Sequence, residues 1–425
     1  MLNMILAALK AAGIAEYIIT EEKKETAELY FVRKALDMPR LRNVSGFRVR
    51  VFRDHVSDGE RMKGESEIKL FPGQTALEVE AELIKAYDAA GFVKNKYYEM
   101  YVPGPGQAGD NAVIDEDGTA DAKEMCLAAA EELYGADTDN FSFVNSAEIF
   151  GSVSRIHILT SAGTDVAYVQ RRVRGEYVVQ CKEPRDVEQY FDFNYKPENL
   201  HELGGAVREA LKTVRDRAGA IDPPQAGVYD IILSGKHLKT VLNYYLERSC
   251  TSMVFPGYSD WVKGTNVQGD KITGEKLSVT AVPDAPYSSE GIFMPSRKLI
   301  SDGKLELLHG NTRHSRYIGA EPTGLYFNLK VDCGTEAFDK LKAGCLYPVS
   351  FSDFQLDSFS GFFGGEIRLA YLFTDDGVKV LTGGSINGNI SEAQADMTFS
   401  LERYADSSYE GPLAVKLKGV RVAGC

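Results

Sequence analysis

The sequence has no long basic block and no long apolar run, and each absence excludes a class of protein. Its 48 Lys and Arg residues are outnumbered by 61 Asp and Glu residues, which gives a net charge of −13. Nucleic acids and anionic membrane surfaces are usually bound through basic patches, so we expect neither as a partner. No segment approaches the roughly 18 uncharged apolar residues of a membrane-spanning helix. Low-complexity tracts are also absent, and the 44% apolar content is typical of a folded globular chain.

The six cysteines form no CxxC pair, and even Cys333 and Cys345, the closest two, are well separated. Small secreted domains space their disulfides more densely, and zinc ribbons use paired cysteines. We therefore expect free thiols and a cytoplasmic protein without a cofactor of its own.

The apolar N-terminus, MLNMILAALKAAGIA, resembles a short signal sequence, but Lys10 interrupts it and no basic segment precedes it. Leu2, Ile5 and Leu9 recur at helical spacing, and Gly13 ends the pattern. The pattern favours an amphipathic first helix.

Strand and helix patterns are mixed along the chain without regular β-α-β alternation, which predicts an α+β fold. Gly46–Phe52 alternates apolar and basic residues, as a half-buried strand does. Thr75 and Glu78 form a T-x-x-E capping box that predicts the start of a helix. We expect two mixed domains of mostly antiparallel sheets with flanking helices, and a β-rich C-terminal half.

Two turns and one domain boundary are predicted from glycine and proline. Arg174-Gly175 is expected to separate a strand at Val166–Gln170 from one at Glu176–Gln180, and Asp375-Asp376-Gly377 reads as a hairpin turn. The segment AIDPPQAG interrupts all periodicity. It divides the chain into an N-terminal α+β domain, residues 1–220, and a C-terminal β-rich domain, residues 221–425.

Common catalytic motifs are not found. His201-Glu202 lacks the second histidine of H-E-x-x-H, because the matching position holds Gly205 and the next one holds Ala206. No phosphate-binding loop, dinucleotide fingerprint or G-x-S-x-G elbow occurs.

The loop HGNTRHSR is one candidate site, since two histidines and two arginines together are able to bind an anion or a substrate carboxylate. A solvated basic turn is the alternative. The residues are His309, Arg313, His314 and Arg316.

Two further candidates remain open. Asp284 and Glu290 flank an irregular segment and are able to act as acid and base, although solvated loop acids are far commoner. Gly361 and Gly384 lie in glycine-rich stretches where an extended peptide is able to approach the backbone closely, although tight turns between strands explain them equally well.

The order of several segments resembles the TldD/PmbA family, whose members are called modulators of DNA gyrase. The resemblance covers most of the chain and rests on the order and spacing of its pieces. These are NVSGFRVRVFRD…GERMKGES, GVYDIILS before a helix, PDAPYSSEG, EPTGLYFNL and FSGFFGGEIRLAYLFTDDGVKVLTGGSINGNISEA.

The family that the sequence resembles has two branches, which differ in their zinc ligands. TldD-like members bind zinc through H-E-x-x-x-H and a cysteine near the C-terminus, whereas TldE (PmbA) members lack these ligands and pair with a TldD-like subunit. Here the motif columns fall on Asn243, Tyr244 and Arg248, and an arginine does not ligate zinc. The cysteine segment is replaced by Ser408-Tyr409-Glu410-Gly411, and Cys425 does not match it.

The resemblance therefore implies a PmbA/TldE-like, non-zinc subunit of a protease assembly that acts on unfolded peptides or proteins, with zinc held only by a TldD-like partner. Heterodimer and homodimer both remain open, and a stand-alone homodimeric peptide-binding protein without catalysis is the alternative. A metal-free hydrolase using Asp284, Glu290 or His314 is a third reading. Because of the net charge of −13, any effect on gyrase is expected to be indirect.

Overall fold

The computed structural model describes residues 1–104, 113–115 and 118–424. Cys425 lies outside these residues. The fold is α+β, as the sequence predicted, with mainly antiparallel sheets. The predicted boundary at residues 220 and 221 falls in the segment between helix α4 and strand β8.

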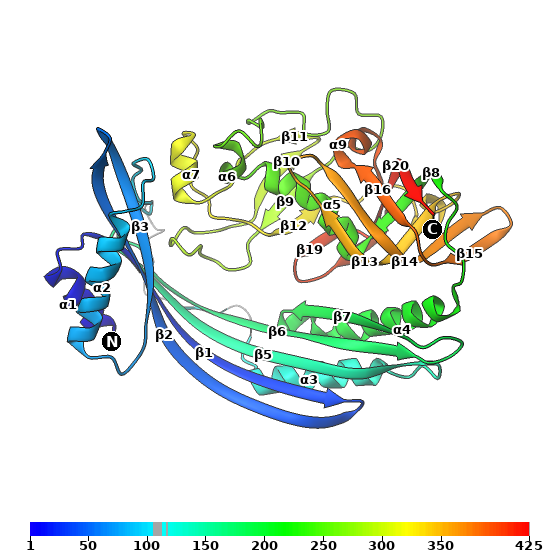
Figure 1. The fold of residues 1–425 in the computed structure, drawn as a ribbon, viewed down its shortest axis with the longest axis horizontal. Helices are drawn as coiled ribbons and strands as arrows, with labels where there is room; N and C mark the ends of the chain where they lie inside the picture. The colour runs from blue at the N-terminus through cyan, green and yellow to red at the C-terminus, as the bar shows by residue number, and fades with distance from the viewer. Residues whose placement is uncertain (105–112, 116–117, 425) are drawn as a thin grey trace.

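A long curved sheet forms most of the N-terminal half (Figure 1). Its strands pair antiparallel, except that β4 runs parallel to β6. Asp58 and Gly59 both have positive φ angles at the tight β2–β3 turn. In spatial order the strands are β3 (Glu60–Leu70), β2 (Ala35–Ser57), β1 (Glu16–Val32), β5 (Ser142–Thr160), β6 (Asp165–Cys181) and β4 (Val113–Ile114), with β7 (Val187–Tyr195) also pairing with β6.

Helices cover one face of this sheet. The capping box of Thr75 and Glu78 forms as predicted and begins α2. Helices α1 and α2 enclose one apolar core with β1, β2 and β3, and α3 and α4 enclose a second with β5 and β6. The bounds are α1 (Leu2–Ala11), α2 (Ala76–Ala90), α3 (Ala122–Ala136), the 3-10 helix η1 (Pro197–Glu202) and α4 (Leu203–Gly219).

The predicted turn at Arg174-Gly175 is wrong, because both residues lie inside the continuous strand β6. A Cβ atom on Gly175 would lie 2.6 Å from the Phe193 ring and 2.4 Å from the Glu148 carbonyl oxygen. The glycine therefore permits close packing within the sheet, which is a common reason for glycine inside a strand.

Two smaller sheets form the C-terminal half and share one large core. In one of them β13, β8, β20, β16 and β14 pair in a closed ring, with β15 beside β14 and β17 beside β20. Thr374 pairs with Gly377, so the hairpin predicted at Asp375-Asp376-Gly377 is confirmed. The strands are β8 (Gly227–Ser234), β13 (Leu346–Leu356), β14 (Phe362–Thr374), β15 (Gly377–Leu381), β16 (Ser385–Asn389), β17 (Thr398–Phe399) and β20 (Ala414–Ala423).

The other sheet lies nearer to the curved sheet's β3 end (Figure 1). Its order is β11 (Lys304–Leu305), β10 (Arg297–Ser301), β9 (Val279–Val282), β12 (Asn328–Val331), β19 (Tyr409–Pro412) and β18 (Arg403–Ala405). The helices of this half are α5 (Gly235–Arg248), α6 (Thr251–Val254), α7 (Thr312–Tyr317), α8 (Phe338–Leu341), α9 (Ile390–Ala393) and η2 (Gln394–Asp396). Within the described residues, no helix is long and apolar enough to cross a membrane.

Candidate binding cleft

The second face of the curved sheet, here called the inner face, is turned toward the C-terminal half. Side chains alternate between the faces of a strand, so Ile18 and Ile158 point to the inner face while Ile19 joins the core under the helices. On the inner face they form an apolar cluster with Tyr168, which Tyr287 of the C-terminal half packs against. The two halves therefore meet across the inner face.

Three adjoining cavities follow this meeting line and form the candidate binding cleft. The largest, about 460 Å³, is lined by Arg50 of the sheet and by Asp284, Tyr287 and Glu290 of the C-terminal half. A cavity of about 240 Å³ shares Asp284 with it, and one of about 270 Å³ shares Arg50. The cleft mixes apolar walls with a few charged groups, as binding sites for organic ligands commonly do.

Segment 283–291, PDAPYSSEG, forms one wall of the cleft and is fixed to the sheet. Arg172 of β6 donates hydrogen bonds to the Asp284 carboxylate at 2.8 Å and to its carbonyl oxygen at 2.9 Å. Gln170, on the same face of β6, donates to the same two groups. The side chain of Asp284 therefore positions this segment against the sheet.

Glu290, at the other end of the segment, is equally engaged. Its carboxylate accepts hydrogen bonds from the backbone N–H of Thr312 at 2.8 Å and from the Thr312 hydroxyl at 2.7 Å. Asp284 and Glu290 thus line one cavity, as an acid–base pair must, but each already has partners within the protein. His314 does not line this cavity.

Helix α7 connects the cleft to the N-terminal half. Arg313 forms an ion pair with Glu65 of β3 at 3.1 Å, and the Tyr317 hydroxyl donates to the Lys96 carbonyl oxygen at 2.6 Å. Burial and the neighbouring Arg313 lower the pKa of His314, with Glu65 acting in the opposite direction. Arg316 is exposed to solvent.

His309 is separated from the other residues of the predicted HGNTRHSR site. It is buried, donates from Nε2 to the Leu246 carbonyl oxygen at 2.9 Å, and accepts at Nδ1 from the Tyr326 backbone N–H. Burial lowers the pKa of His309 to about 4, although the bond to Leu246 acts to raise it. Its ring therefore joins α5 to the segment before α7, while Arg313 lies between the two halves.

Gly361 and Gly384 lie beside the ring-forming sheet and do not line the three cavities of the cleft. Both have positive φ angles, 76° and 75°, directly before β14 and β16. Their geometry agrees with the alternative explanation, tight turns between strands, since glycine adopts positive φ at low cost.

The three residues that the resemblance aligns with the zinc motif, Asn243, Tyr244 and Arg248, lie on α5, and none of them provides the imidazole, thiolate or carboxylate that zinc prefers. Arg248 forms an ion pair with Asp260 at 2.9 Å and lies 5.6 Å from the Tyr244 ring centre. Asn243 has a buried side-chain oxygen for which the structure provides no hydrogen-bond donor. Across the described ranges, no three His, Cys, Asp or Glu side chains are grouped so as to hold a metal ion. The residues therefore do not fit the zinc site of the TldD branch.

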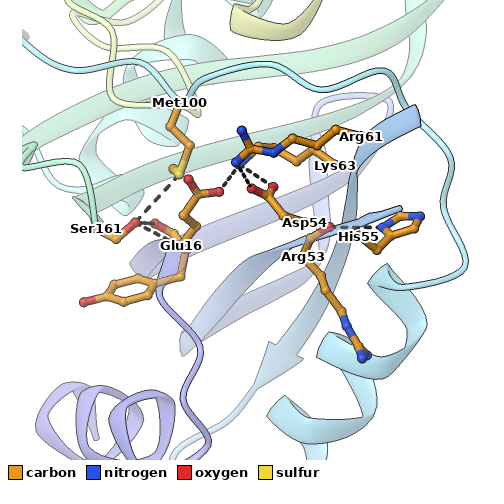
Figure 2. A network of polar contacts seen from close by, with 9 residues as sticks. Glu16, Arg53, Asp54, His55, Arg61, Lys63, Met100 and Ser161 are labelled. Carbon is orange, nitrogen blue, oxygen red and sulfur yellow. Dashed lines mark hydrogen bonds and ion pairs between the residues drawn. The ribbon is translucent and has the colours of Figure 1, made fainter. Parts of the chain in front are cut away.

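Figure 2 shows a polar network around Lys63, a buried lysine of β3. The Lys63 side chain is 0% exposed, pairs with Glu16 and Asp54, and its ammonium lies 5.9 Å from the ring centre of Tyr98, a member of the inner-face cluster. Burial acts to raise the pKa of Asp54, but hydrogen bonds from Lys63 and Arg61 outweigh it and lower that pKa.

The arginines of the cleft were not predicted as site residues from the sequence. Arg48 and Arg50 were visible in the alternating pattern of Gly46–Phe52, which placed them on one face of a strand but not opposite segment 283–291. Arg172 has no local signal, because its partner Asp284 lies 112 residues away.

Family models assign this architecture to a class of protein. The central domain of the PmbA/TldA metallopeptidases matches residues 113–218, and the C-terminal domain of the same group matches residues 226–424. Together these matches span more than two thirds of the chain. The chain belongs to the TldD/PmbA family, as its resemblance indicated.

Solved structures of similar proteins share the fold over nearly the whole chain. TldE from Thermococcus kodakarensis has a TM-score of 0.78 at 15% identity, covering 99% of this chain and 100% of its own. A candidate modulator of a DNA gyrase from Thermotoga maritima has a TM-score of 0.76 at 16% identity, covering 99% of each chain. A candidate modulator of DNA gyrase from Bacteroides thetaiotaomicron has the same score and identity, covering 100% of this chain and 98% of its own. No curated protein sequence matches the chain.

Proposed function

We propose that this chain is a TldE/PmbA-type subunit that binds unfolded or extended polypeptide and works with a zinc-bearing, TldD-like partner. The observation that carries the proposal is the filling of the zinc-motif columns by Asn243, Tyr244 and Arg248 in a chain of metallopeptidase ancestry. Arg248 has no ionisable form that ligates zinc, and its ion pair with Asp260 fixes it in another role. Zinc would then be supplied by the partner alone.

The cleft supports the peptide-binding part of the proposal. Its three cavities adjoin one another through shared lining residues, so an extended chain of several residues would fit along the inner face better than a compact metabolite. Unpaired thiols at Cys126, Cys181, Cys250 and Cys345 support a cytoplasmic location.

Reconstitution tests the assembly. The chain is mixed with a TldD-like protein carrying H-E-x-x-x-H, and degradation of an unfolded, fluorescently labelled polypeptide is followed. We expect the mixture to degrade it faster than the partner alone and the chain by itself to be inactive. A mixture that degrades nothing while the partner alone is active contradicts the assembly.

Metal analysis provides an independent check. Purified alone, the chain should contain zinc well below one equivalent, and the mixture should contain zinc in proportion to the partner. Stoichiometric, tightly held zinc in the chain alone would overturn the non-zinc role.

A stand-alone, homodimeric peptide-binding protein remains the second candidate, because binding a peptide in the cleft requires no metal ligand from this chain. Peptide binding with a molar mass twice that of the chain, and no association with any TldD-like protein, would favour it.

A further inference from the structure

The inner face of the curved sheet is basic beside the cleft, although the whole chain carries a charge of −13. A cavity of about 300 Å³ on β1, β2 and β3 is lined by Lys24, Arg42, Arg48 and Lys69, with Glu22 as its one acidic lining residue. We call this cavity the basic trough. Four basic residues against one acidic residue reverse the charge balance of the molecule at this place.

Two of these side chains repel each other across neighbouring strands. Arg48 of β2 pairs in register with Lys69 of β3, and like charges directly opposite one another destabilise a sheet. Two residues along on the same face, Arg50 is opposite Glu67 and forms an ion pair with it at 3.2 Å. Within the part of the chain that the structure describes, Arg48 and Lys69 have no ion pair of their own. An anion bound between them would relieve the repulsion.

The basic trough continues into the binding cleft. It shares Thr20 and Arg48 with the cavity of about 270 Å³, and that cavity shares Arg50 and Ser289 with the largest one. A ligand that extends along the cleft therefore reaches Arg48 and Lys69.

An open strand edge lies beside the trough. Strand β3 pairs with β2 only from Phe47 to Ser57, so residues 35–46 of β2 have no described strand on that side. Their outward backbone groups are free to pair with an added strand. Val44 and Phe71, which are 49% and 52% exposed, provide apolar contact at the same place.

We propose that the basic trough binds an acidic stretch of extended polypeptide, whose carboxylates pair with Arg48 and Lys69 while the rest of the peptide follows the cleft. This inference rests on the proposed peptide-binding function and specifies its substrate class as Asp- and Glu-rich segments. The open edge of β2 favours a peptide over a nucleic acid, because only a peptide backbone matches the hydrogen-bonding pattern of a strand edge.

Binding of short labelled ligands tests the proposal. Unstructured Glu/Ser, Lys/Ser and Gly/Ser peptides of equal length, and an oligo-dT strand, are titrated with the full chain, alone and mixed with its TldD-like partner, and fluorescence anisotropy is measured. We expect the Glu/Ser peptide to bind most tightly and to weaken as salt rises, because exposed charge pairs are screened.

The double variant Arg48→Gln/Lys69→Gln should bind the Glu/Ser peptide roughly five- to tenfold more weakly and the Gly/Ser peptide as before. The matched control is Lys10→Gln/Lys123→Gln, which removes the same charge from two exposed side chains that do not line the trough, and it should bind like the unchanged protein. Thermal unfolding of the double variant shows whether weaker binding results from a loss of folding. Because the variant removes the repulsion between Arg48 and Lys69, its unfolding midpoint should be unchanged or higher.

Each contrary outcome has its own meaning. Equal binding of the Glu/Ser and Gly/Ser peptides, unchanged in Arg48→Gln/Lys69→Gln, would overturn the acidic preference and leave peptide binding in place. Failure of every peptide to bind would overturn the proposed function and this inference together. Binding of oligo-dT alone, lost in the double variant, would overturn the peptide assignment of the trough.

Discussion

At the residue scale, the buried charge of Lys63 bears on the stability of the folded protein. Its side chain is 0% exposed, while those of its partners Glu16 and Asp54 are 37% and 36% exposed. The ammonium is thus removed from water, whereas the Glu16 and Asp54 carboxylates that pair with it (Figure 2) remain partly exposed to solvent.

Replacing Lys63 with Ala should reduce the free energy of unfolding by about 2–3 kcal/mol. Removing one partner of a fully buried pair costs about 3–5 kcal/mol, and the partial exposure of Glu16 and Asp54 reduces that cost. Urea unfolding measures the change. Lys85→Ala is the control, because Lys85 is 70% exposed in a surface pair with Glu82, and it should change stability by less than about 0.5 kcal/mol. Equal effects of the two substitutions would contradict this account.

Two buried histidines should make the protein sensitive to mild acid. Burial lowers the pKa of His237 to about 3 and that of His309 to about 4, whereas the unfolded chain has the ordinary value of about 6.5. The unfolded state therefore takes up protons first, so stability is complete above about pH 6.5 and is lost as the pH falls below it.

The substitution His237→Phe should reduce this acid sensitivity. Each buried histidine contributes a loss of about 1.6 kcal/mol between pH 6.5 and pH 5, and the variant removes one of the two contributions. The His237 ring already packs edge-on against Phe351 and Phe354, so a phenyl ring suits the site. Urea unfolding at both pH values measures the loss. A variant that loses as much stability as the unchanged protein would contradict the assignment to His237.

At the scale of elements, close packing of α3 on β5 depends on one glycine. A Cβ atom on Gly151 of β5 would lie 2.1 Å from the Ala122 carbonyl oxygen and 2.9 Å from Cys126 Sγ, both in α3. The helix therefore rests directly on the strand backbone, and Cys126 donates a hydrogen bond to the Ala27 carbonyl oxygen of β1.

Gly151→Ala should destabilise the protein by about 1–3 kcal/mol, because α3 must move away from the sheet. The control in the same helix is Gly135→Ala, where the added Cβ meets nothing within 4 Å. Alanine is the better helix former there, so Gly135→Ala should stabilise the protein by up to about 1 kcal/mol. Chemical unfolding of both variants measures the difference, and a tolerated Gly151→Ala would show that the helix is not held at this distance.

At the scale of the whole molecule, polar contacts join the two halves at separate places. Arg172 fixes segment 283–291, Arg313 pairs with Glu65, and the Tyr371 hydroxyl donates to Asp216 of α4 at 2.6 Å. The walls of the cleft are therefore held from both sides, so its shape depends on contacts between residues far apart in sequence.

Arg172→Ala should loosen segment 283–291 and weaken peptide binding. The expected result is faster amide hydrogen exchange in that segment, because Asp284 loses two of its hydrogen bonds to the sheet. Arg174→Ala is the matched control, since Arg174 lies two residues along on the same face and its guanidinium lies 5.8 Å from the ring centre of Phe150 in β5. Unchanged exchange in Arg172→Ala would show that Gln170 alone holds the segment.

Features with local signals could be predicted from the sequence. The capping box of Thr75, the hairpin at Asp375-Asp376-Gly377 and the first helix depend on residues within a few positions of one another. Gly175 was misjudged because the reason for it, the Phe193 ring, comes from a neighbouring strand. The cleft could not be predicted from short sequence patterns for the same reason, since its walls come from residues more than one hundred positions apart.

The long β1–β2 hairpin has a consequence for synthesis of the chain. Strand β1 pairs with β2 immediately, but its other edge pairs with β5, which begins at Ser142. At 5–20 residues per second, a ribosome needs roughly 4–17 seconds to translate from the end of β2 to the start of β5. During that interval the nascent hairpin exposes an edge of up to fifteen paired positions, so capture by a chaperone at this stage would protect it from aggregation.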